Sequence, residues 1–151
     1  MRILRLELAG FGPFRDRQTI DFAELSHQGL FLIAGKTGSG KSSILDAVVY
    51  ALYDFVPRFD KKSDEIRSRF CSPTQRTQVV LEFSHLGRDF RITRSPAYER
   101  PSQRGDGFVV EKAAQSFEEY IDGSWQVMAT KARDVDAKRT CLLYTSDAAD
   151  E

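Results

Sequence analysis

Residues 35–42 are Gly-Lys-Thr-Gly-Ser-Gly-Lys-Ser and match the phosphate-binding pattern G-x-x-x-x-G-K-[ST] without a mismatch. Glycines in such a loop let the backbone curl, so that consecutive N–H groups point at phosphate oxygens. We expect Lys41 to reach the β- and γ-phosphates as a point charge, and the Ser42 hydroxyl to coordinate Mg²⁺, which takes oxygen ligands. The candidate phosphate-binding residues are Gly35, Lys36, Thr37, Gly38, Ser39, Gly40, Lys41, Ser42 and Ser43.

The segments on either side of this loop are of the kind that positions a phosphate site. The continuous apolar run over residues 30–34 predicts a strand covered on both faces. Apolar residues at i, i+4, i+7 and i+8 predict a helix over residues 41–53, with Ile44, Val48, Ala51 and Leu52 on its buried face and Pro57 beyond its end. The N-terminal amides of that helix would face the same anion as the loop.

The remaining pattern predicts short strands joined by turns. Alternation predicts strands over residues 2–9 and 18–22, and a hairpin over residues 79–92 that turns at His85-Leu86-Gly87. Asp122-Gly123 predicts a second hairpin between residues 117–121 and 125–128. The other expectations are loops over 57–77 and 95–107, a short strand over 108–111, and a helix that starts within 130–140.

The acid that hydrolysis requires is harder to find than the phosphate loop. Phosphoryl transfer needs a metal-holding acid on a second strand and a group that orients water. Glu82 ends an apolar run and could be that acid, but its alternating neighbours favour an ordinary strand residue. We interpret Asp46 as a structural or capping residue, and both His27 and His85 as surface residues.

Several motifs, taken in order, resemble the N-terminal ATPase lobe of the SbcC family, which belongs to the SMC-like branch of ABC-type ATPases. The motifs are Phe11-Gly12-Pro13-Phe14, Ile20-Asp21-Phe22, the phosphate loop with its continuation Ser43-Ile44-Leu45-Asp46-Ala47, Ala51-Leu52-Tyr53, Pro57-Arg58, and the hairpin with Glu82-Phe83 and Phe90-Arg91-Ile92-Thr93-Arg94. The phosphate loop alone indicates an NTPase, whereas its continuation points to this branch.

The resemblance implies an α/β fold: a P-loop NTPase, the N-terminal lobe of an ABC-type ATPase head with an antiparallel β portion, truncated here. Residues 1–140 would form this incomplete ATPase lobe. Family members continue into a long coiled coil with a zinc hook, then a C-terminal lobe with the signature motif and the Walker B acid. By similarity, Arg67, Ser68 and Arg69 would approach the nucleotide, as would the turn at Gly12-Pro13.

The resemblance also implies a function. ATP and Mg²⁺ would drive head-to-head homodimerisation, and a partner nuclease subunit of the SbcD type would process double-stranded DNA ends and hairpins during double-strand break repair. The full-length protein would then be an ATPase and an exonuclease subunit, and this fragment alone would be inactive. Two alternatives remain: another SMC-like recombination or chromosome-organising ATPase, and a free-standing nucleotide-binding module.

The charge balance bears on the DNA partner. The chain has 151 residues, 22 basic and 22 acidic, which argues against a wholesale electrostatic binder of nucleic acid. Residues 57–104 nevertheless hold eleven Lys or Arg against six acids. Such a patch is either an ordinary solvated surface or a sequence-blind contact with DNA phosphates. Arg91 and Arg94 are the candidate DNA contacts on the hairpin.

Residues 141–151 do not fit the family pattern. Cys-Leu-Leu-Tyr-Thr-Ser, read back as TGT-CTC-TTA-TAC-ACA-TCT, resembles the transposon-end adapter used for sequencing libraries, so we expect a non-native tail. The tail holds three acids and no Lys or Arg, which leaves residues 1–140 mildly basic. The absence of an apolar run of membrane length and of a signal peptide predicts no membrane partner and a cytoplasmic protein.

Overall fold

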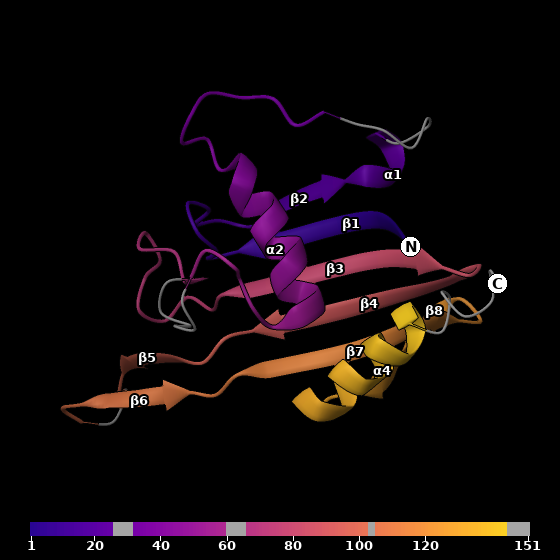
Figure 1. Ribbon diagram of the computed structural model, residues 1–151. Coiled ribbons are helices and arrows are strands. Elements are labelled where there is room, and N and C mark those ends of the chain that lie inside the picture. Colours follow the sequence, from indigo (N-terminus) through magenta and orange to yellow (C-terminus); the bar gives the residue numbers. More distant parts are fainter. Residues whose placement is uncertain (26–31, 60–65, 103–104, 145–151) are drawn as a thin grey trace.

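A six-stranded antiparallel sheet carries two longer helices on one face in the computed structural model (Figure 1). The structure describes residues 1–25, 32–59, 66–102 and 105–144. The strand order is β2-β1-β3-β4-β7-β8, and β5 and β6 form a separate two-stranded sheet. The strands are β1 (Arg2–Ala9), β2 (Gln18–Asp21), β3 (Gln78–His85), β4 (Arg88–Ser95), β5 (Tyr98–Pro101), β6 (Phe108–Glu111), β7 (Ala114–Ile121) and β8 (Ser124–Ala129). The helices are α1 (Phe22–Leu25), α2 (Lys41–Tyr53) and α4 (Ala132–Tyr144).

The hydrophobic core lies between the sheet and its two helices. Figure 1 shows α2 crossing the strands on one face of the sheet, with α4 on the same face beside β7 and β8. Alternate strand residues point into this layer, as the period of a β-strand requires. The fully buried ones include Leu6, Leu8, Leu81, Phe83, Ile92 and Phe117.

The two predicted hairpins are confirmed, and each turns on a pair of residues with positive φ. Leu86 and Gly87 have φ of 50° and 73°, and Asp122 and Gly123 have φ of 48° and 82°. Two-residue turns with positive φ at both central positions match the right-handed twist of the flanking strands. These turns fix the register that places Leu81 opposite Ile92 in the core.

The P-loop helix α2 spans the predicted residues, but its buried face differs from the prediction. Ala47, Tyr50, Ala51 and Leu52 are its buried apolar residues, whereas Ile44 and Val48 are only partly buried against the core. The helix ends before Pro57 because Asp54 adopts a left-handed conformation, with φ of 56°, and donates its N–H to the carbonyl oxygen of Tyr50.

Two expectations about secondary structure are wrong. No strand forms over the described part of residues 30–34, where Leu32 is 89% exposed, because no described strand pairs with it; residues 30 and 31 lie outside the described residues. The expected loop over 95–107 contains β5, which pairs with β6. The helix expected to start within residues 130–140 is confirmed: α4 begins at Ala132 and runs to Tyr144, and Leu142, in the expected tail, packs against the core.

The expectation that His85 lies on the surface is also wrong. It shares the parity of Leu81 and Phe83 on β3 and is therefore buried, with 7% of its surface exposed. Its Nε2 atom has no hydrogen-bond partner among the described residues. His27 lies outside the described residues.

Candidate phosphate-binding site

The phosphate loop borders a cavity of about 370 Å³ at the N-terminal end of α2. Most of its lining residues belong to the loop and the first turn of the helix, as the sequence pattern predicts. The lining residues are Pro13, Thr37, Gly38, Gly40, Lys41, Ser42, Ser43 and Arg58. Both charged residues among them are cations, so the cavity wall suits an anion.

Glycines shape the loop at two positions where the backbone requires them. Gly38 and Gly40 have φ of 84° and 89°, a conformation that other residues rarely adopt. A Cβ atom on Gly40 would lie 2.5 Å from Cζ of Phe14, whereas one on Gly38 would meet nothing within 4 Å. Gly40 therefore also allows the turn over residues 11–14 to pack directly against the start of α2, and this turn brings Pro13 into the cavity wall.

Lys41 folds back over its own loop. Its Nζ donates hydrogen bonds to the carbonyl oxygens of Gly35 at 2.5 Å and Lys36 at 2.8 Å. The ammonium is thereby held beside the cavity at the start of a helix, where backbone N–H groups and the helix dipole favour an anion. A phosphate oxygen carries more negative charge than a carbonyl oxygen, so a bound nucleotide would compete well for this ammonium.

Arg58 is the lining residue that sequence reasoning missed as a site residue. It follows α2 in the chain and pairs with Asp46, whose side chain is 11% exposed, through hydrogen bonds from Nε to Oδ1 at 3.3 Å and from Nη2 to Oδ2. The hydrogen bond to Asp46 raises the pKa of Arg58. No short motif points to Arg58, because its partner Asp46 lies 12 residues earlier in the chain.

Residues 67–69, expected by similarity near the nucleotide, line a different cavity of about 580 Å³. Arg67 is engaged with the protein itself: it donates hydrogen bonds to the carbonyl oxygens of Gln75 and Ser72 and stacks 4.1 Å from the ring centroid of Tyr98. Ser68 is buried and Arg69 is exposed. The structure therefore does not bring these residues into the cavity of the phosphate loop.

Arg91 and Glu82 belong to a charged cluster on the sheet face that α2 and α4 do not cover. Glu82, Arg91 and Glu118 are direct neighbours across β3, β4 and β7, and Arg91 pairs with both acids at 2.9 Å and 3.2 Å. Arg91 also stacks 4.0 Å from the ring centroid of Trp125. Glu82 is thus an ordinary strand residue, and it does not line the phosphate cavity.

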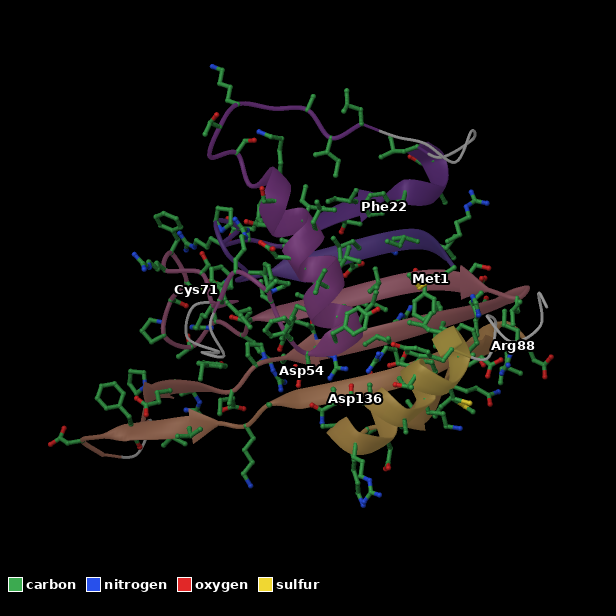
Figure 2. All side chains as sticks on the ribbon, in the orientation of Figure 1. Met1, Phe22, Asp54, Cys71, Arg88 and Asp136 are labelled. Carbon is green, nitrogen blue, oxygen red and sulfur yellow. The ribbon has the colours of Figure 1, made fainter. Side chains whose placement is uncertain are left out.

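Arg94 is buried, which contradicts its assignment as a DNA contact. It lies on the opposite face of β4 from Arg91, with 1% of its side chain exposed. Its guanidinium donates to the carbonyl oxygen of Ala51 at 2.8 Å and to Asp136 at 2.6 Å, and it lies 3.6 Å from Asp54. Figure 2 shows Asp54 at the end of α2 and Asp136 on α4, so Arg94 joins the two helices.

These features define the chain as part of a P-loop NTPase fold of mixed α/β structure. It belongs to the AAA domain family, whose model matches residues 5–134. Its relatives include the SbcC component of the SbcCD nuclease from several bacteria, and the expected resemblance to the SbcC family is confirmed.

These SbcC relatives are much longer than this chain. The protein from Vibrio cholerae is 46% identical over 109 residues, which cover 72% of this chain and 11% of that protein. The Staphylococcus saprophyticus protein is 42% identical over 98 residues, covering 65% of this chain and 10% of that protein. The Staphylococcus epidermidis protein is 34% identical over 131 residues, which cover 87% of this chain and 12% of that protein. The chain therefore spans about a tenth of the length of the relatives it matches.

The fold also resembles a solved structure, the SMC head domain from Thermotoga maritima. The two share 24% sequence identity with a TM-score of 0.48, over 91% of this chain and 42% of the head domain.

Among the described residues, no helix has the length and apolar character needed to cross a membrane.

Proposed function

We propose that this chain is the ATP-binding N-terminal part of an SbcC-like ATPase that controls the processing of DNA ends and hairpins by a partner nuclease. The observation that carries the proposal is the cationic cavity between the phosphate loop and the start of α2. Its left-handed glycines, its lysine and its helix N-terminus supply the groups that a triphosphate requires. The kinship with the SbcC component of the SbcCD nuclease supports the choice of nuclease partner.

The residues present fit ATP and magnesium. Ser42 lies at the first turn of α2 in the cavity wall, where its hydroxyl would be a magnesium ligand, and Lys41 would hold the β- and γ-phosphates. Bound Mg²⁺ would neutralise charge on the phosphates. No carboxylate lines the cavity within the described ranges, so we assign hydrolysis to the full-length protein and propose that this chain alone is inactive.

The partners that we propose follow from the family. They are an SbcD-type nuclease subunit, double-stranded DNA and a second ATPase head in a head-to-head homodimer, with the cytoplasm as the compartment. We also propose that residues 141–151 are non-native. A longer genomic sequence tests this point: the proposal fails if residues 141–151 are encoded there and followed by a stop codon.

Nucleotide binding by the full-length protein tests the proposed function. Titration calorimetry with ATP and Mg²⁺ should show binding by the parent protein and none by the Lys41→Ala variant, because the charge that pairs with the phosphates is lost. Arg133→Ala, which removes an exposed arginine on α4, is the matched control and should bind like the parent. Retained tight binding by Lys41→Ala would refute the role assigned to the loop.

A further inference from the structure

Arg58 gives the phosphate cavity a second cation besides Lys41. Its side chain is 51% exposed, and it is the lining residue that comes from beyond the end of α2. A planar guanidinium presents five N–H donors in a fixed geometry that matches phosphate oxygens. The pair with Asp46 uses Nε and Nη2, so donors remain for an anion in the cavity.

Asp46 holds this guanidinium beside the cavity. The residue is buried, with 8% of its surface exposed, and it sits one helical turn after Ser43. The guanidinium carbon also lies 5.8 Å from the centroid of the aromatic ring of Phe59. An arginine anchored through a buried carboxylate and a ring loses less rotational freedom when it binds a ligand than a free one does.

We propose that Arg58 is a phosphate-binding residue of the nucleotide site and that Asp46 is its positioning residue. This inference rests on the proposed function and adds a ligand to it. It replaces residues 67–69, which line another cavity, as the arginine contact to the nucleotide.

A purely structural role is the competing explanation, in which the pair only ties the segment after α2 to the helix. The two roles differ in what they predict for nucleotide affinity. A structural tie affects thermal stability, and its loss should not depend on the charges of a ligand. A phosphate contact lowers the Kd for ATP, and this gain in affinity becomes smaller as the salt concentration rises. Replacing the arginine with lysine should keep part of the gain, because lysine keeps the charge without the planar geometry.

The experiment measures the Kd for ATP with Mg²⁺ in the full-length protein by titration calorimetry, at low and high salt. Arg58→Ala should raise the Kd about 10-fold at low salt, the lower end for a charge-assisted hydrogen bond, because the side chain is half exposed. Arg58→Lys should recover part of this loss. Asp46→Asn should raise the Kd by a smaller factor, and should add nothing once Arg58 is already alanine.

The outcomes separate the inference from the proposed function. The inference would be overturned if Arg58→Ala binds ATP with a Kd within about twofold of the parent's and Lys41→Ala abolishes binding. Normal binding by Lys41→Ala would instead overturn the proposed function. An Asp46→Asn loss of equal size in the presence and absence of Arg58 would overturn the positioning role. Arg58→Lys, which keeps a cation beside Asp46, guards against misfolding of the alanine variant, and Arg133→Ala controls for lost charge.

Discussion

Replacing Arg94 with methionine should destabilise the fold strongly, because one buried guanidinium holds three groups from two helices. Its side chain is 1% exposed, and it contacts the Ala51 carbonyl oxygen, Asp54 and Asp136. Removing one partner of a buried ion pair typically costs about 3–5 kcal/mol. The side chains of Asp54 and Asp136 are 46% and 42% exposed and can be rehydrated, so we expect about 3 kcal/mol, at the low end of that range.

Urea unfolding followed by circular dichroism measures this loss. With an m-value of about 2 kcal/mol/M, the unfolding midpoint of Arg94→Met should fall by about 1.5 M. Arg133→Met, at an exposed position on the same helix as Asp136, should stay within about 0.5 kcal/mol of the parent. Combining Arg94→Met with Asp136→Asn should cost less than the sum of the single variants. A loss below about 0.5 kcal/mol for Arg94→Met would refute the account of this cluster.

Two further predictions concern the phosphate loop and pH. Gly40→Ala should lower the melting temperature and ATP affinity more than Gly38→Ala, because both need positive φ but only at Gly40 would a Cβ collide with Phe14; equal effects in thermal melts and ATP titrations would contradict this packing. Arg88 lowers the pKa of Glu119 below its ordinary 4.5 in the folded protein, through hydrogen bonds of 2.6 Å and 2.7 Å. This pair therefore stabilises the fold above about pH 4.5, and its contribution is lost as the pH falls toward the lowered value. Glu119→Gln should reduce the loss of stability between about pH 6 and pH 3 in urea titrations, and an unchanged pH profile would count against the pair.

Local patterns predicted most of the sheet and the phosphate loop. Alternation and the turn residues Leu86-Gly87 and Asp122-Gly123 determined both hairpins, since these signals depend only on near neighbours in sequence. The motif likewise predicted the cavity at the start of α2, because the loop and the first helical turn form one continuous segment. Arg91 and Arg94 are three residues apart in one strand, so the period of two predicts that they lie on opposite faces of β4, as observed.

What sequence could not supply depends on partners distant in the chain. Parity does not say which face of a strand is covered, so the pattern alone does not reveal that α2 and α4 enclose Arg94. An apolar run becomes a strand only beside another strand, and none of the described strands pairs with residues 32–34, the described part of the run over 30–34. Arg58 reaches the cavity through a pair with Asp46, 12 residues earlier in the chain, which no short motif records.

A structure of the full-length protein bound to a non-hydrolysable ATP analogue and Mg²⁺ tests the central claim most directly. We expect the triphosphate in the cavity beside α2, with the Lys41 ammonium moved from the carbonyl oxygens of Gly35 and Lys36 to phosphate oxygens and the Ser42 hydroxyl on the metal. A nucleotide bound elsewhere, with Lys41 still donating to its own loop, would contradict the account.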